Sequence, residues 1–236
     1  MIGPLLEEGL PALGLAPPAG AVERLDRYAE LLLEKNQVMN LTAITEPEQV
    51  ARLHMLDCAA LLNVCPLEGN RLLDVGTGAG FPGMVLKILV PSLDVTLLDS
   101  LNKRLDWLAE TCGALGLTGI RTVHARAEER SHDPAFRETF DAVTSRAVAE
   151  LRTLCELCLP YVRPGGYFLA MKSVDSDREI EDAAAAVKIL GGGLERVQDY
   201  EIPGTDIRHR VVVIKKLLET PKKYPRAFAK MKKNPL

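Results

Sequence analysis

The stretch LLDVGTGAGFPG, residues 72–83, decides the fold. A short apolar run that ends in an acid leads into a glycine-rich turn, which is typical of a buried strand followed by a ligand-binding loop. A triphosphate loop requires GxxxxGK[ST], and no Lys-Ser or Lys-Thr follows these glycines at that spacing. Gly78, Gly80 and Gly83 match the dinucleotide pattern GxGxxG, but Pro82 inside it has no N–H, which suits a pyrophosphate poorly.

The turn fits the pattern DxGxGxG better, with Asp74, Gly76, Gly78 and Gly80 at its four positions. A carboxylate here would repel a pyrophosphate, whereas it suits the ammonium and sulfonium groups of S-adenosylmethionine. The glycines let the backbone approach the ligand where a Cβ would collide with it. A helix expected to begin near Pro82 would direct its first amides toward the carboxylate of the ligand. The turn therefore favours S-adenosylmethionine as cofactor.

Two further positions match an adenosine site. Asp99 ends the next expected strand, where a carboxylate accepts two hydrogen bonds from a ribose diol. Dehydrogenases use the same arrangement, so Asp99 supports adenosine binding without choosing between cofactors. Ala127 and Glu128 follow the third expected strand and are placed to frame the edge of the adenine.

The patterning divides the chain into three parts. Residues 1–68 are expected to form a small helical N-terminal extension, since helical periodicity runs through residues 19–64. Residues 69–218 alternate strands with helices, which predicts an α/β domain with a mostly parallel sheet. The expected strands are 71–75, 95–99, 121–125, 141–145, 166–172 and 210–216, with one more after a GGG break, and the loop 202–209 could close an antiparallel pair. Residues 219–236 form a basic C-terminal tail.

Charge is distributed unevenly along the chain. The net charge is −3, but residues 215–236 contain eight Lys or Arg and one Glu, a net of +7, which leaves −10 for the remainder. An acidic body with a basic tail is predicted. The tail contains three prolines and few apolar residues, and we expect it to be extended or mobile. Its candidate RNA-binding cations are Lys222, Lys223, Arg226, Lys230, Lys232 and Lys233.

The cysteines and the hydropathy indicate the compartment. Five cysteines without an export signal argue against a disulfide framework, and no apolar run is long enough for a membrane span. We expect a cytoplasmic monomer with no disulfide partner. Cys155 and Cys158 form a CELC pair inside a helical pattern, and no second CxxC or nearby histidine completes a metal site. No bound metal is expected, and both cysteines are interpreted as ordinary helix residues.

The residues after the fourth expected strand narrow the choice of methyl acceptor. Enzymes that methylate exocyclic amines usually carry [DN]PP[YFW] there, but this chain has TSRAVAEL, residues 144–151. Methylation of a pyrimidine carbon needs a cysteine nucleophile, which is absent from that region. An acceptor that is already nucleophilic, such as guanine N7, needs alignment rather than a general base. Arg146 would suit guanine O6 or the cofactor carboxylate, although a surface salt bridge is equally consistent.

Several stretches together resemble the bacterial 16S ribosomal RNA guanine-N7 methyltransferases, the glucose-inhibited division protein B family. They are MNLTAITEPEQVARLHMLDC, DVGTGAGFPG, VTLLDSLNKRLDWL, ARAEE, TSRAVAEL and TPKKYPR, and the match runs from about residue 22 to the end. The resemblance implies a class I, Rossmann-like, seven-stranded methyltransferase fold. It implies transfer to a guanine in the 530 loop, with 16S RNA or the small ribosomal subunit as partner. It places cofactor contacts at Gly76, Phe81, Ala127, Glu128 and Arg146.

The same resemblance identifies candidates on the substrate side. The leader reads RLHMLDC where the family commonly has RHFLDS, so His54 and Asp57 keep the functional positions and Cys58 replaces a serine. With Arg146 they are the substrate-side candidates, although His54 could equally be a packed helix residue. Two other functions stay open. The acidic body favours a small-molecule methyltransferase and the basic tail opposes it, while the intact Asp74 opposes a catalytically silent adenosyl-binding module of ribosome assembly.

Overall fold

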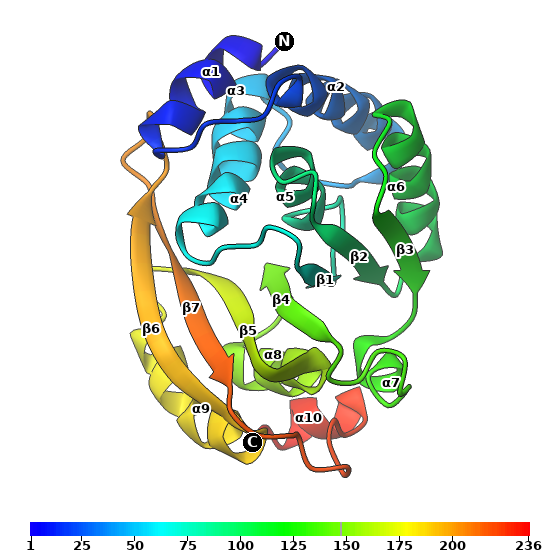
Figure 1. The fold of residues 1–236 in the computed structure, drawn as a ribbon, viewed down its shortest axis with the longest axis vertical. Coiled ribbons are helices and arrows are strands. Elements are labelled where there is room, and N and C mark those ends of the chain that lie inside the picture. Colours follow the sequence, from blue (N-terminus) through cyan, green and yellow to red (C-terminus); the bar gives the residue numbers. More distant parts are fainter. Residues whose placement is uncertain (147) are drawn as a thin grey trace.

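Seven strands form one sheet in the order β3-β2-β1-β4-β5-β7-β6 (Figure 1). The computed structural model describes residues 1–146 and 148–236. The strands are β1 Arg71–Val75, β2 Asp94–Asp99, β3 Ile120–His124, β4 Phe140–Arg146, β5 Val162–Ser173, β6 Gly192–Glu201 and β7 Arg208–Lys216. The first five pair in parallel, and β7 pairs antiparallel with both β5 and β6. The strand order reverses beside β1, which is where such sheets bind ligands.

Helices cover both faces of the sheet, so the central strands are buried on both sides and read as apolar runs. One face packs against α5 (Gly83–Leu89), α6 (Asn102–Ala114) and the N-terminal helices. The other packs against α8 (Leu151–Cys158), η3 (Leu159–Tyr161), α9 (Asp177–Ile189) and α10 (Phe228–Lys233), and the short α7 (Ala127–Arg130) follows β3. The predicted α/β class and the predicted seven-stranded sheet are confirmed.

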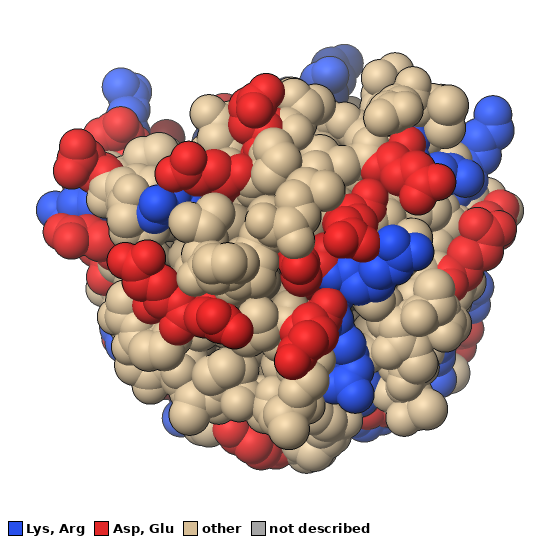
Figure 2. Space-filling model, turned by 90° about the horizontal axis from the view of Figure 1, so that it is seen from above, with Lys and Arg blue, Asp and Glu red and all other residues tan. Residues whose placement is uncertain are grey.

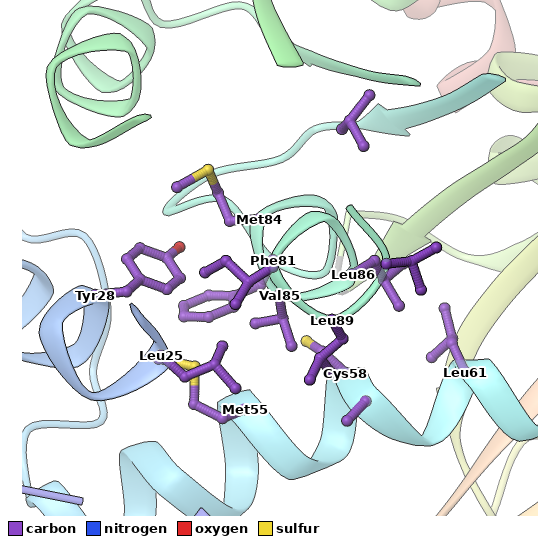
Figure 3. Packing of buried hydrophobic residues seen from close by; sticks show 14 of the residues in the cluster. Leu25, Tyr28, Met55, Cys58, Leu61, Phe81, Met84, Val85, Leu86 and Leu89 are labelled. Atoms are coloured by element: carbon purple, nitrogen blue, oxygen red, sulfur yellow. The ribbon is translucent and has the colours of Figure 1, made fainter. Parts of the chain in front are cut away.

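The N-terminal segment contains more helix than the periodicity indicated. Its elements are α1 Gly3–Ala12, α2 Ala21–Met39, α3 Pro47–Val50, the π-helix η1 Ala51–Leu56, α4 Asp57–Ala59 and the 3₁₀ turn η2 Ala60–Asn63. Helix α1 lies within the predicted helical extension, residues 1–68, but before the range 19–64 in which helical periodicity was recognised. In Figure 3 the Tyr28 side chain on α2 points toward Phe81 and Met84 at the glycine turn and α5. The Tyr28 hydroxyl also donates a hydrogen bond to the Ala79 carbonyl, so α2 helps to shape that turn.

The C-terminal tail is docked on the body, and the prediction of an extended or mobile segment was wrong. Tyr224 and Met231 are buried in the core cluster beneath α8, and residues 228–233 form α10. Arg137 on the body donates to the carbonyls of Thr220 at 2.7 Å and Tyr224 at 3.0 Å. The composition of the tail did not indicate this docking, because the segment is ordered by a few contacts with the body rather than by an apolar pattern of its own.

The face that carries the N-terminal helices has acidic side chains spread among uncharged ones, with basic side chains scattered between them (Figure 2). The docked tail lies at the opposite end of the molecule (Figure 1). No helix of the described residues combines the length and the apolar composition that a membrane crossing requires.

The CELC pair lies within α8, as predicted for ordinary helix residues. Cys155 and Cys158 are both fully buried in the cluster between α8 and the sheet. Burial raises the pKa of each thiol, which keeps both thiols protonated. The pair therefore contributes to packing.

Candidate active site

A cavity of about 480 Å³ opens beside the carboxyl ends of β1, β2 and β4. Its volume is in the range of small-molecule sites. Its wall is assembled from the glycine turn, the segments after β2 and β3, the end of β4, the N-terminal segment and the tail. The lining includes Thr42, His54, Gly76, Gly78, Phe81, Asp99, Ala127, Glu128, Arg146, Leu157 and Phe228.

The three glycines of the turn have different roles. All have positive φ, at 71° for Gly76, 58° for Gly78 and 94° for Gly80. A Cβ on Gly78 would meet no atom closer than 3.9 Å, so this residue leaves space at the cavity wall. A Cβ on Gly80 would lie 2.6 Å from both the Tyr28 hydroxyl and Met84 Cγ. Gly80 is therefore required by the packing of the chain itself, and it does not line the cavity.

Asp74 holds the glycine turn and does not line the cavity. Its Oδ2 accepts hydrogen bonds from the Thr77 hydroxyl at 2.6 Å and the Gly83 N–H at 2.9 Å. Its Oδ1 has no hydrogen-bond partner among the described residues, and burial raises its pKa to about 6. The arrangement does not match the expected direct contact with the ligand ammonium. It also occupies the Gly83 amide, the first N–H of α5, which was expected to face the ligand.

Asp99 lines the cavity with its carboxylate held in place. Its Oδ2 accepts from the Gly78 N–H and its Oδ1 from the Leu101 N–H, both at 2.9 Å. Each oxygen keeps one lone pair for a further donor. Ala127 and Glu128 line the same cavity beyond the end of β3, and the Tyr161 hydroxyl fixes the Ala127 carbonyl at 2.6 Å. The structure thus brings the three residues predicted for ribose and adenine to one wall.

His54 lies on the π-helix η1. Such π-helical turns are rare in proteins, and those that occur are often found at functional sites. Arg146 Nη2 lies 3.0 Å from His54 Nδ1, and Thr42 Oγ1 lies 2.8 Å from His54 Nε2. Nδ1 also lies 3.1 Å from the Leu53 carbonyl, which Arg146 Nη1 already donates to. Because a guanidinium can only donate, its bond to Nδ1 requires the tautomer in which Nδ1 accepts and Nε2 carries the proton, which it donates to Thr42. Burial and the adjacent Arg146 lower the pKa of His54 to about 4. The imidazole is therefore neutral near pH 7.

Asp57 joins four elements through one buried carboxylate. Its Oδ2 accepts from Arg146 Nη1 at 3.0 Å, and its Oδ1 accepts from the Tyr200 hydroxyl at 2.7 Å and His209 Nδ1 at 2.8 Å. Burial opposes ionisation of Asp57, but the bond from His209 and the charge of Arg146 outweigh it and lower its pKa. The bond to Asp57 raises the pKa of His209 in turn. Tyr200 on β6 and His209 on β7 were missed because no local motif marks them.

Arg146 is largely buried and pairs with the buried Asp57, so the alternative of a surface salt bridge is wrong. Its side chain is 17% exposed, and its guanidinium carbon lies 5.0 Å from the centre of the Phe81 ring. The His54 ring stacks on the same Phe81 at 4.4 Å between centres. The structure therefore brings the three substrate-side candidates together, with His54 and Arg146 lining the cavity and Asp57 buried outside its lining. Cys58 is buried in the core instead, and Ala147 of the SRAV stretch lies outside the described residues.

The tail contributes to the cavity in a way that the sequence did not indicate. Phe228 lines the cavity, although every expected cofactor contact lay between residues 74 and 146. Arg226 forms a bidentate ion pair with Glu156 on α8, in which Nε donates to Oε1 at 2.8 Å and Nη2 donates to Oε2 at 2.6 Å. Arg226 is therefore occupied on the body and is removed from the RNA-binding candidates. The five lysines of that set are exposed.

Comparison with known proteins identifies the family. The family described as "GidB: rRNA small subunit methyltransferase G" matches residues 21–209. Ribosomal RNA small subunit methyltransferase G of Lachnoclostridium phytofermentans is 48% identical over 97% of this chain and 95% of its own length. The protein of the same name from Symbiobacterium thermophilum is 49% identical, over 98% of this chain and 97% of its own.

The fold has its own counterpart among solved structures. A SAM-dependent O-methyltransferase from Thermotoga maritima superposes with a TM-score of 0.54 over 80% of this chain and 73% of its own, at 16% identity. That likeness shows the class I methyltransferase fold. Together with the relatives, it makes this chain an S-adenosylmethionine-dependent methyltransferase. The chain belongs to the rRNA small subunit methyltransferase G family.

Proposed function

We propose that this enzyme transfers a methyl group from S-adenosylmethionine to N7 of a guanine in 16S ribosomal RNA, in the 530 loop. Relatives that carry the name ribosomal RNA small subunit methyltransferase G support the RNA substrate. They favour it over the small-molecule enzyme and over the silent binding module. We also propose that the enzyme is a cytoplasmic monomer, and a ribosomal substrate supports the cytoplasmic location.

Guanine N7 is supported as the methyl acceptor by the absence of a free general base among the described substrate-side candidates. The acceptor lone pair of His54 is occupied by Arg146, and its proton is directed to Thr42. Asp57 accepts three hydrogen bonds and is 1% exposed. Guanine N7 has a lone pair and loses no proton before attack, so the reaction requires alignment alone. This cluster can align a base without removing a proton from it.

We propose the following arrangement of the cavity. Asp99 accepts the ribose hydroxyls, Ala127 and Glu128 frame the adenine, and the backbone at Gly78 lies against the ligand. Bound there, S-adenosylmethionine supplies an electrophilic methyl group on a sulfonium. Phe81 and Arg146 lie at the opposite wall, where Arg146 donates to the guanine or to the cofactor carboxylate. Asp57 and His54 fix the direction of that guanidinium.

Conversion of Asp99 to Ala is expected to weaken cofactor binding at least roughly tenfold, because two charge-assisted hydrogen bonds worth about 1.5–3 kcal/mol each are lost. Calorimetric titration with S-adenosylhomocysteine measures the change. Asp106→Ala is the matched control, since its carboxylate lies on the exposed side of α6. Equal affinities in the Asp99 variant and the wild type would exclude the proposed cofactor position.

The proposed reaction is tested by incubating the enzyme with methyl-labelled cofactor and either naked 16S RNA or small ribosomal subunits. Methylation at N7 makes a guanine susceptible to borohydride reduction and aniline cleavage, so the modified nucleotide is located by strand scission. A single cut in the 530 loop is expected. Label that enters the RNA without creating a cleavable site would rule out N7, and label found only in a metabolite pool would rule out the RNA substrate.

We further propose that the exposed lysines of the tail bind RNA phosphates; they are Lys222, Lys223, Lys230, Lys232 and Lys233. Each phosphate neutralised on a single strand contributes about 0.7 to the slope of log affinity against log salt, so changing all five to Gln should flatten the slope by up to about 3.5. Filter binding at four salt concentrations measures it. Lys188→Gln, on the exposed side of α9, is the control. Superimposable slopes would instead place recognition on the N-terminal helices around Arg52 and His54.

A further inference from the structure

Phe228 is an aromatic side chain of the docked tail that lines the cavity while more than a third of its surface is exposed. Nothing in the sequence motifs assigns it a role. A large apolar side chain gains free energy when a ligand covers it, and an aromatic ring does so most effectively against another flat π-system.

The position of Phe228 is fixed by contacts on both sides of it in the chain. Two residues earlier, Arg226 pairs with the buried carboxylate of Glu156. Three residues later, Met231 is fully buried in the core cluster. The Pro225 carbonyl lies 3.1 Å from His132 Nε2, just beyond α7. Phe228 is therefore held at the cavity by α8 and the end of α7.

Its neighbours identify the half of the ligand that it would meet. Helix α10 lies beside α7 and α8 in Figure 1, and α7 begins at Ala127, on the wall proposed for adenine. Leu157 of α8 lines the same cavity. The methyl-acceptor cluster of His54 and Arg146 comes from the N-terminal segment and β4 instead.

We propose that Phe228 forms part of the S-adenosylmethionine site and contacts the adenosyl group, so that the docked tail completes the cofactor pocket. The inference rests on the proposed placement of the cofactor in this cavity. It gives the tail a second task beside RNA binding, because one short helix carries both Phe228 and three of the exposed lysines.

The test is calorimetric titration of the full chain with S-adenosylhomocysteine and, separately, with adenosine. Aromatic stacking on a base is worth about 1–3 kcal/mol by alanine substitution, so Phe228→Ala should weaken the binding of both ligands by roughly 5- to 150-fold. Phe228→Tyr keeps the ring and should restore binding. Leu218→Ala, an exposed apolar residue that lies outside the cavity lining, should leave both affinities unchanged.

The outcomes separate this inference from the placement on which it rests. Reduced binding in Asp99→Ala together with unchanged binding in Phe228→Ala would overturn the role of Phe228 alone. Unchanged binding in both variants would overturn the cofactor placement as well. Loss of S-adenosylhomocysteine affinity with adenosine unaffected would show that Phe228 meets the amino-acid end, and would overturn the adenosyl contact. Far-ultraviolet circular dichroism and urea midpoints confirm that each variant is folded.

Discussion

Conversion of Asp57 to Ala is expected to lower the free energy of unfolding by about 3–5 kcal/mol, the usual cost of leaving a buried charge without its partner. The charge in question is Arg146, whose side chain is 17% exposed and whose carboxylate partner would vanish. Tyr200 and His209 lose their acceptor at the same time. Urea unfolding monitored by circular dichroism measures the change.

Methyl transfer should fall together with stability, because Arg146 then has no anion to fix its direction across Phe81. Asp57→Asn should have a stability and a methyl-transfer rate between those of the wild type and of Asp57→Ala. Its amide oxygen can still accept from Arg146, while its amide nitrogen faces Tyr200 and His209, which can both act as acceptors. Single-turnover methylation at saturating cofactor separates this effect from cofactor binding.

The matched control is Asp177→Ala. Asp177 also pairs with an arginine, Arg210, but its side chain is 81% exposed, so less than about 1 kcal/mol is expected. If Asp57→Ala also changed stability by less than about 1 kcal/mol, the carboxylate could not be the anchor of Arg146.

The sequence predicts the sheet and the wall of the cavity around Asp99, because those features are local. An apolar run that ends in an acid predicts both a buried parallel strand and a side chain at its carboxyl end. Asp99, Ala127 and Glu128 follow successive strands, and parallel strands bring their carboxyl ends to one edge of the sheet.

The role of Asp74 shows where local motifs fail. Its position in the pattern is correct, but the side chain turns back to the Thr77 hydroxyl and the Gly83 amide. Gly80 is similar, since the atoms that exclude a Cβ are those of Tyr28 and Met84. A pattern of residues gives spacing along the chain and does not state which partner each residue meets.

Tertiary contacts between distant segments were the least accessible to prediction. Asp57 meets Tyr200 and His209 across more than 140 residues, and no spacing rule links them. The tail was interpreted by its composition, and composition does not reveal that Met231 and Arg226 each find a buried partner on the body. Because the tail was expected to be mobile, the contribution of Phe228 to the cavity was not predicted.

The pair between Arg226 and Glu156 provides the second large effect. Glu156 is 1% exposed, and Arg226 supplies both of its carboxylate oxygens with side-chain donors. Arg226→Met should therefore lower the free energy of unfolding by about 3–5 kcal/mol, since among the described residues it leaves the buried carboxylate only the backbone N–H of residue 226 as a donor. Urea unfolding measures the loss, and Arg27→Met, which breaks an exposed pair on α2, should cost less than about 1 kcal/mol.

A double-mutant cycle shows whether the penalty comes from the unpaired charge. The variant that combines Arg226→Met with Glu156→Leu removes both charges of this pair, and replacing a buried pair by apolar side chains is often close to neutral. The double variant should therefore be more stable than Arg226→Met alone. Simple additivity of the two single changes would contradict the coupling. Because Arg226 precedes Phe228 by two residues, the double variant should also restore cofactor affinity lost in Arg226→Met, which would show that docking of the tail, rather than its charge, serves the cavity.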